Sequence, residues 1–325
     1  MLSLPRFLLA TLGPAALAIV YVAISTLGLG LYGHALFIFL PFVMTAFMIA
    51  TLGWRRRPRI WEFPVAWFAM VGSTGVGLLG VGLEGLICLA MALGLVAIVA
   101  VPIIAVSIIA SHFLVATEAK SGCGSSTAAA IFALLLPLLT AMEYRIGIPE
   151  SIFQTSTSII VAAPREVVWR HVVSFSDISG EPAWYFRKGI AYPLRARIEG
   201  TGVGAVRYCE FSTGPFVEPI TVWDEPAHLA FSVESSPPAM TELNPFRNVA
   251  PPHIHDYFKS HRGEFRLEEL PGGKTLLTGT TWYSHRIAPS WYWNLWTKHL
   301  LHDIHTRVLM HVKGLAEAEG AGAGE

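Results

Sequence analysis

The chain has 325 residues, of which 53% are hydrophobic and only 14% are charged. A soluble domain carries about 25% charged residues, so this composition excludes a wholly soluble protein and places part of the chain in lipid. Residues 1–150 hold only seven of the 23 Lys and Arg and five of the 23 Asp and Glu, whereas the remainder has an ordinary, slightly acidic balance. Neither half is basic enough to indicate a nucleic-acid partner.

The first half contains apolar stretches near or above the ~20 residues that cross a bilayer. They are Phe7–Leu31, Ala35–Trp54, Phe63–Ala110 and Thr127–Met142. The third stretch is long enough for two spans that fold into a hairpin at Glu84, and the fourth, interrupted by Pro137, is the weakest. No small-residue cleavage site follows the first stretch, which is therefore expected to stay as a helix. We predict a transmembrane helical bundle of about five spans over residues 1–150.

The orientation of this bundle follows from its dense basic loop, Trp54–Arg59, because short basic loops stay cytoplasmic. Five spans place the second half of the chain outside the cytoplasm. Four spans, with Thr127–Met142 as an interfacial or re-entrant segment, leave it inside. We expect five spans and an extracytoplasmic second half. The bundle shows no paired acids or broken-helix repeat typical of a transporter, so we interpret it as a membrane anchor.

The second half has the alternating, turn-punctuated pattern of a soluble α+β domain. A strand at Thr155–Val161 is followed by helices at Arg165–Val173 and Pro182–Arg187. Six further strands are predicted at Leu194–Glu199, Gly204–Phe211, Val217–Trp223, Leu229–Val233, Gly263–Glu269 and Lys274–Tyr283. Their turn-like connections predict antiparallel pairing. A long amphipathic helix from about Pro289 to Leu315 follows, and residues 319–325 are expected to be a disordered tail.

The motif Gly200-x-Gly202-x-x-Ala205 has the spacing of a dinucleotide-binding fingerprint. That fingerprint has meaning only where a strand is followed by a helix. Here the next residues, Val206–Phe211, alternate and are β-branched or aromatic, which predicts a second strand. We therefore interpret the glycines as a hairpin turn with positive φ.

One strand, two helices, six strands and a long last helix form an order that resembles the helix-grip fold of the START-like (SRPBCC) superfamily, the polyketide cyclase/dehydrase and lipid-transport group. The residues that carry the resemblance are Ile159–Trp169, Gly200–Gly204, Val222–Phe231 and the terminal helix. The resemblance implies that, over residues 151–318, an antiparallel sheet wraps the last helix and leaves an apolar cavity between them. It implies nothing about the membrane half.

The titratable candidates for such a cavity are Tyr208, Glu210, Glu218 and His299. Half of the side chains of a strand face solvent, so Glu210 and Glu218 are each expected outside. The hairpin leaves two alternatives open, because a one-residue change of register exchanges the faces. A three-residue turn puts Tyr208 and Glu210 on the inner face. A two-residue turn puts there instead Ala205, Arg207 and Cys209, together with Ala196 and Ile198.

Neither a metal nor a cofactor is expected. His253-x-His255-Asp256 has a plausible ligand spacing, but a zinc site would need a further acid or thiolate nearby. His299, His302 and His305 drift about 60° per three-residue step on a helix, so they cannot share one face. The three cysteines are far apart, form no C-x-x-C pair, and support neither a zinc site nor a disulfide framework.

The segment Ser235–His261 is long, rich in proline and apolar. Loops of this length are usually functional or disordered. We interpret it either as a lid over the cavity or a surface that touches lipid headgroups, or as a loop packed on the edge of the sheet.

We expect the protein to bind or transport a hydrophobic small molecule, such as a lipid, in a cavity tethered to the membrane. A cyclase- or dehydratase-like enzyme and a ligand-sensing interaction module are the alternatives, and the sequence leaves open whether any reaction is catalysed. Aromatic residues suit an amphipathic ligand because they combine apolar area with a polar group. The expected ligand-binding residues are Tyr208, Glu210, Phe231, Trp282, Trp293, Trp296 and His299.

Overall fold

The computed structural model describes residues 3–53, 59–113, 124–246 and 248–322. The chain divides into two compact units. The helical unit comprises Met1–Pro149, Glu242–Pro252 and Ile287–Tyr292. The sheet unit comprises Glu150–Thr241, His253–Arg286 and Trp293–Glu325. After residue 150 the chain therefore returns to the helical unit twice.

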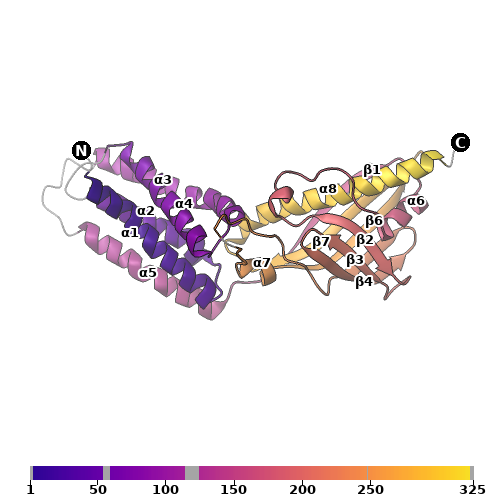
Figure 1. The fold of residues 1–325 in the computed structure, drawn as a ribbon, viewed down its shortest axis with the longest axis horizontal. Helices are drawn as coiled ribbons and strands as arrows, with labels where there is room; N and C mark the ends of the chain where they lie inside the picture. Colours follow the sequence, from indigo (N-terminus) through magenta and orange to yellow (C-terminus); the bar gives the residue numbers. More distant parts are fainter. Residues whose placement is uncertain (1–2, 54–58, 114–123, 247, 323–325) are drawn as a thin grey trace. The chain divides into compact units, whose positions relative to one another are not determined.

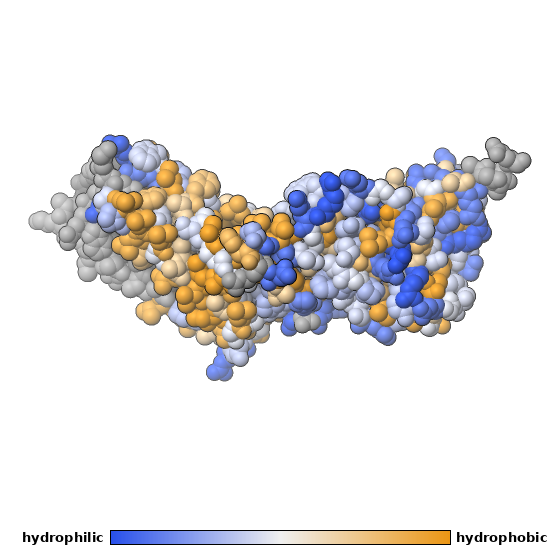
Figure 2. All heavy atoms as spheres, in the orientation of Figure 1, coloured by the Kyte–Doolittle hydropathy of each residue, from blue (hydrophilic) through white to orange (hydrophobic). Residues whose placement is uncertain are grey.

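The helical unit is built from the apolar stretches of the first half (Figure 1). Its helices are α1 (Leu4–Ala23, continued by a π-helical turn, Ile24–Gly28), α2 (Leu40–Gly53, preceded by a π-helical turn, Ala35–Phe39), α3 (Glu62–Val81), α4 (Leu86–Phe113) and α5 (Gly124–Ile146). Figure 2 shows apolar residues gathered over these helices. Among the described residues, four segments are long and apolar enough to cross a membrane: Leu4–Gly28, Ala35–Gly53, Glu62–Val81 and Leu86–Val106. Helix α5 is not one of the four, so a fifth span stays a prediction.

Helix α5 ends beside the connection between α1 and α2. The hydroxyl oxygens of Tyr21 and Thr140 are 2.5 Å apart. Near the end of α5, the Glu143 carboxylate accepts hydrogen bonds from the backbone N–H groups of His34 (2.6 Å) and Ala35 (3.2 Å). A carboxylate at this position satisfies N–H groups that a helix start leaves without partners and complements the helix dipole. These contacts make α5 antiparallel to α2.

Residues 242–244, from the long segment Ser235–His261, hold the turn between α3 and α4 within the helical unit. The Glu242 carboxylate accepts hydrogen bonds from the N–H groups of Ile87 (3.3 Å) and Cys88 (3.0 Å) at the start of α4. The side-chain amide of Asn244 donates to the carbonyl of Leu79 (2.9 Å), in the last turn of α3. The middle of this segment therefore packs on helices, which neither the lid interpretation nor the sheet-edge interpretation anticipates.

The sheet unit is a seven-stranded antiparallel sheet with a long last helix (Figure 1), which confirms the predicted helix-grip fold. Its strands are β1 (Ile152–Val161), β2 (Pro193–Glu199), β3 (Val206–Phe211), β4 (Gly214–Asp224), β5 (His228–Ser232), β6 (Phe258–Leu270) and β7 (Lys274–His285), in the spatial order β1-β7-β6-β5-β4-β3-β2. Its helices are α6 (Arg165–Val173), a 3₁₀ turn (Phe186–Lys188), α7 (His253–Asp256) and, from Trp293 onward, α8 (Ser290–Gly322). The helix predicted at Pro182–Arg187 is thus only the 3₁₀ turn.

Alternation along the strands places the core on one face of the sheet, against α6 and α8. Leu229, Leu267 and Leu277 of the sheet are buried together with Val172 of α6 and Leu309 of α8. Each fully buried side chain of this kind contributes about 1.5–3 kcal/mol. This packing is what holds α8 across the sheet.

The glycine motif forms the turn of a hairpin, as predicted. The last pair before the turn is Glu199 with Val206, and Gly200, Gly202 and Gly204 all have positive φ (89°, 82° and 90°). Such values strain any residue with a Cβ, which explains the three glycines. No helix follows the motif, and the turn is not a phosphate-binding loop.

Helix α8 continues beyond the predicted domain end at residue 318. It runs to Gly322, whereas disorder is predicted from residue 319. Within these last turns, the Glu319 carboxylate accepts hydrogen bonds from Arg170 and from His171 of α6, the latter at 2.7 Å. The extra turns are thus fixed to α6 by charged side chains that composition alone does not reveal. Residues 323–325 lie outside the described residues.

Candidate functional site

The inner face of β3 and β4 carries a buried ion pair. Arg207 is 1% exposed and Glu218 is 6% exposed, and Arg207 Nη1 donates to Glu218 Oε2. The two residues lie directly opposite each other in the antiparallel register of β3 and β4. The expectation that Glu218 faces solvent is therefore wrong: alternation from Ile220, which is buried in the core, puts Glu218 inside.

Three phenylalanine rings surround the guanidinium group of this pair. The Arg207 Cζ atom lies 5.7 Å from the ring centre of Phe175, 5.4 Å from that of Phe231 and 5.6 Å from that of Phe265. The faces of aromatic rings attract a cation, more strongly when it is shielded from water. The rings and the Glu218 carboxylate together make a buried charge tolerable here.

The buried environment also sets the protonation of the neighbouring groups. Burial raises the pKa of the Cys209 thiol to about 12, so the thiol is protonated near neutral pH. Burial also raises the pKa of the Glu218 carboxyl, and the charge of Arg207 opposes that rise. The hydrogen bond from the always-charged guanidinium favours the ionised form of Glu218 and so limits the rise of its pKa.

One buried nitrogen of the Arg207 side chain, Nε, makes no hydrogen bond within the described part of the chain. More than about 90% of buried polar groups in folded proteins are hydrogen-bonded. Arg207 itself is not among the residues that line the pocket described next.

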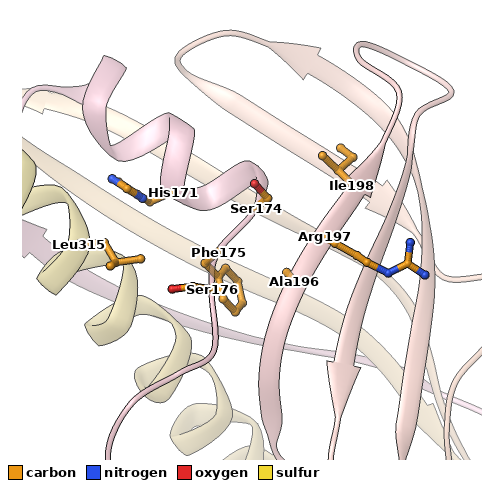
Figure 3. A pocket seen from close by; sticks show the side chains of 8 residues that line it. All are labelled: His171, Ser174, Phe175, Ser176, Ala196, Arg197, Ile198 and Leu315. Carbon is orange, nitrogen blue, oxygen red and sulfur yellow. The ribbon is translucent and has the colours of Figure 1, made fainter.

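A pocket of about 480 Å³ opens beside this pair, between the end of α6, strand β2 and helix α8 (Figure 3). Its lining residues are His171, Ser174, Phe175, Ser176, Ala196, Arg197, Ile198 and Leu315. The Arg197 guanidinium points away from the other labelled side chains in Figure 3. His171 and the two serines give the pocket a polar side, whereas Phe175, Ile198 and Leu315 give it an apolar side.

The pocket is next to the contact that fixes the end of α8. His171, which lines the pocket, has its Nε2 atom 2.7 Å from the Glu319 carboxylate. The hydrogen bonds to His171 and Arg170 lower the pKa of Glu319 below its ordinary value. His171 is therefore engaged with the carboxylate.

A separate polar network joins α8 to strands β1 and β7. The Thr157 hydroxyl is 2.9 Å from His302 Nδ1 and 3.3 Å from His305 Nδ1, and the Thr281 hydroxyl is 2.8 Å from His305 Nε2. Burial lowers the pKa of His305 to about 4, so its ring is neutral near pH 7. The network fixes the register of α8 on the sheet. Two of the three helix histidines converge, while the third, His299, lies apart.

The hairpin residues expected at the polar end of the cavity lie outside it. Tyr208 stacks with Arg197, whose Cζ atom is 4.0 Å from the ring centre, and Glu210 pairs with Arg195 at 2.7 Å. Both pairs are on the face opposite Arg207. The three-residue alternative for the turn is therefore wrong, since the observed register is the one that a two-residue turn would give.

The two aromatic candidates on the sheet, Trp282 and Phe231, lie on opposite faces of it. Trp282 stacks with Arg262, 3.9 Å from the ring centre, on the face opposite Thr281 and Tyr283, whose hydroxyls bond to α8. The expectation that Trp282 faces α8 from the sheet is thus wrong. Phe231 lies on the inner face in the core that also contains Phe175.

The remaining candidates are on α8. Trp293 is buried and Trp296 is half-buried, but neither lines the pocket described above. The His299 side chain is 60% exposed and lies 3.6 Å from Asp303 on its own helix. Of the predicted ligand-binding residues, the structure therefore brings only Phe231 to the buried pair.

The Arg207–Glu218 pair was not predicted from the sequence. The signal was available: a two-residue turn at Ser212-Thr213 sets Arg207 opposite Glu218. Two opposite charges in a direct cross-strand position, flanked by apolar residues, indicate a pair.

Comparison with known proteins gives a likeness of fold over about half of the chain. No family model matches the chain, and no curated protein matches it significantly. The half that contains the sheet is similar to the solved structure of Ara h 8.0201, with 10% identity over 52% of this chain and 99% of that one and a TM-score of 0.31. It is also similar to the Zhui aromatase/cyclase from Streptomyces sp. R1128 (15% identity, 53% and 94% covered, TM-score 0.31).

A protein from Nitrosospira multiformis is similar as well, with 16% identity over 50% of this chain and 94% of that one and a TM-score of 0.33. Identities and TM-scores this low carry no argument about function. The helix-grip assignment rests on the strand order and on the helix that crosses the sheet.

Proposed function

We propose that this protein binds or transports a hydrophobic small molecule, such as a lipid, in its sheet unit, and that the helical unit anchors it in a membrane. The observation that carries the proposal is the pocket of about 480 Å³ between α6, β2 and α8. Small-molecule sites are typically about 300–1,000 Å³, mostly apolar, with a few placed polar groups. The apolar wall of Phe175, Ile198 and Leu315 and the opposite wall of His171 and serines fit that description.

The state of the titratable groups near the pocket favours binding over catalysis. An acid–base catalyst works best with a pKa near the operating pH. The Cys209 thiol is protonated because burial raises its pKa to about 12. Glu218 is held by Arg207 and His171 by Glu319. Glu218 and His171 are thus each bonded to a charged partner side chain, and Cys209 stays protonated. This arrangement suits structure and ligand recognition.

The direct test is to purify the full chain in lipid nanodiscs and to identify the small molecules that it retains by mass spectrometry of an organic extract. Empty nanodiscs of the same lipid composition serve as the control. We expect one class of hydrophobic molecule to be enriched with the protein over the nanodiscs. An extract that matches that of the empty nanodiscs, together with no uptake of added labelled lipids, would contradict the proposal.

We further propose that the chain crosses the membrane five times and that the sheet unit lies outside the cytoplasm. The contact of Glu143 with His34 puts the end of α5 beside the α1–α2 connection. The basic segment Trp54–Arg59 joins α2 to α3, at the opposite end of α2, and basic loops stay cytoplasmic. Alkaline phosphatase fused to the C-terminus should therefore be active, whereas a bright fluorescent fusion at that position would support four spans.

A further inference from the structure

The two edges of the seven-stranded sheet differ in how they are protected. Strand β2 forms one edge and β1 forms the other (Figure 1). An edge strand presents a row of backbone N–H and C=O groups to any further strand, and folded proteins block this row with charged residues, proline, a bulge or a covering segment. A comparison of β2 with β1 therefore shows which edge is closed.

Strand β2 carries all of these protections. It begins at Pro193 and contains three charged side chains, and its register with β3 is irregular between Pro193 and Arg195. The segment after α6 covers its outer side, where the N–H group of Ile178 donates to the carbonyl of Leu194 (2.7 Å). The β2 edge of the sheet is therefore closed.

Strand β1 lacks the first three protections. Its ten residues, Ile152–Val161, include no charged residue and no proline, and they pair with β7 at ten consecutive positions without a shift of register. The side chains of Ile152 and Ile160, near its ends, are 66% and 51% exposed. Within the described residues, no strand lies beyond β1. A long, regular, uncharged edge of this kind is a place where another strand can pair.

Contacts with α8 at the end of β1 show which backbone groups face the open edge. Lys313 Nζ donates to the carbonyl of Ile160 (2.8 Å). The N–H group of Ala162 donates to the Glu317 carboxylate (2.7 Å). Backbone groups alternate in direction along a strand, so those of the even-numbered residues are directed away from β7. Alternation places three more residues of this set along the open edge: Gln154, Ser156 and Ser158.

The serine side chains leave this edge accessible. The Ser156 hydroxyl oxygen is 2.9 Å from that of Thr280 on β7. The Ser158 hydroxyl oxygen is 2.8 Å from that of Thr278, also on β7. Both side chains are therefore held over the sheet, and neither crosses the edge at which the backbone groups point outward.

We propose that the open edge of β1 pairs with β1 of a second copy of this chain, antiparallel and with Ser156 on the two-fold axis. The two seven-stranded sheets then continue into one. The inference goes beyond the proposed binding function and does not depend on it. In this register each residue meets one of similar character: Ile152 with Ile160, Phe153 with Ile159, Gln154 with Ser158, Thr155 with Thr157, and Ser156 with its own copy.

This self-complementarity selects a second copy as the occupant of the edge. A two-fold interface brings the same surface of both chains together, so each residue has to suit the one that it meets. Apolar residues meet at both ends of β1 and small polar residues meet in its middle. The charges also match, because neither strand brings a charge that the other would have to neutralise. The backbone groups of Gln154, Ser156 and Ser158 exchange hydrogen bonds across the axis.

Cysteine cross-linking tests the register in the full chain purified in detergent. Opposite residues of a hydrogen-bonded antiparallel pair have Cα atoms about 5.5 Å apart, which a disulfide can join. Ser156→Cys should therefore form a linked dimer under mild oxidation, above the background of the natural cysteines. Gln154→Cys is the matched control on the same face, because its two copies lie about 14 Å apart across the axis, and it should not link. A mixture of Gln154→Cys and Ser158→Cys chains should link one to the other.

A charge on the axis tests whether β1 holds the dimer together. Ser156→Lys sets two like charges directly opposite each other, which destabilises a cross-strand pair. Thr221→Lys is the control, because Thr221 is exposed on β4, a strand inside the sheet. Light scattering in detergent should give twice the mass of one chain for the natural protein and for Thr221→Lys. It should give the mass of one chain for Ser156→Lys, and the Tm of each variant reports whether it is folded.

Each result decides for or against the pairing. A natural protein that is monomeric at every concentration overturns it, even where an extended peptide of another protein binds the edge. A dimer that folded Ser156→Lys leaves intact, or in which Ser156→Cys forms no disulfide, overturns β1 as the interface. Equal cross-linking of Gln154→Cys and Ser156→Cys overturns the register. If Ser156→Lys does not fold, the two cysteine variants decide alone.

Discussion

Substitution of Arg207 alone by methionine is expected to destabilise the sheet unit strongly. The change leaves the Glu218 carboxylate, which is 6% exposed, without the guanidinium that it faces. Removing one partner of a buried ion pair costs about 3–5 kcal/mol. For a domain of about 150–250 residues, each kcal/mol lowers Tm by about 2–4 °C. The Tm of the sheet unit should therefore fall by roughly 6–20 °C.

The double substitution Arg207→Met and Glu218→Met should be far milder. Replacing both partners of a buried pair by apolar groups of similar volume is often neutral or stabilising, because no charge remains in the core. The excess of the two single losses over the double loss gives the coupling between the residues. The assay is thermal unfolding of the full chain in detergent, followed by tryptophan fluorescence.

The exposed pair of Arg195 and Glu210 is the control for this cycle. Its partners are 52% and 26% exposed, and surface pairs of this kind contribute about 0–1 kcal/mol. Methionine at either position should change Tm by only a few degrees. An Arg207→Met variant that melts with the natural protein, or a double variant as unstable as the single one, would refute the reasoning that a buried, mutually dependent pair holds this face of the sheet.

Three further predictions concern other parts of the chain. A Cβ atom at Gly85 would lie 1.9 Å from Glu242 Oε2. Gly85→Ala should therefore release residues 242–252 from the helices and raise the hydrogen exchange of their backbone amides. Gly75→Ala is the control, because a Cβ atom there meets no atom within 4 Å, and it should leave that exchange unchanged. Burial lowers the pKa of His305 to about 4, against about 6.5 in an unfolded chain. The folded protein favours the neutral ring, so its free energy of unfolding should decrease as the pH falls from about 6.5 towards 4. This decrease should be about 3 kcal/mol larger than in His305→Gln, which has no such titration. Equal decreases in the two proteins would contradict this prediction. Cys209, with its pKa raised to about 12 by burial, should resist iodoacetamide at neutral pH until the sheet unit unfolds, as peptide mass spectrometry can show.

The fold was predictable because its signals are local and repeated. Apolar stretches of bilayer length define the helical unit, and period-two alternation with turn residues defines the strands. The hairpin at Gly200–Ala205 was predictable for the same reason, since a strand rather than a helix follows the glycines. The long amphipathic pattern gave α8 as far as Leu315. Its last turns were not predicted because they depend on the contact of Glu319 with α6, whose residues are about 150 positions away in the sequence.

The site was harder to predict because it depends on strand register. A shift of one residue exchanges the two faces of a strand, and the glycine-rich turn leaves that shift undetermined. Tyr208 and Glu210 were therefore open candidates until the pairing of Glu199 with Val206 fixed the faces. The prediction for Trp282 was wrong for a related reason. Its size suggests burial, but side chains alternate along a strand, and it is the residues on either side of Trp282 that contact α8. Composition predicts that aromatic residues line a cavity and does not say which of them do.

Filling the pocket tests the central claim, that the sheet unit binds a hydrophobic molecule beside α6, β2 and α8. Ile198 lines the pocket and is half-buried at the edge of the core, so Ile198→Trp should place its larger ring in the pocket. Arg195→Trp, on the outer face of the same strand, is the control. The measurement is the amount of hydrophobic molecule that the full chain retains in nanodiscs. We expect a loss of at least about tenfold in affinity for Ile198→Trp, in a variant that still unfolds cooperatively, while the control binds as the natural protein does. A folded Ile198→Trp variant that binds as tightly as the natural protein would contradict it.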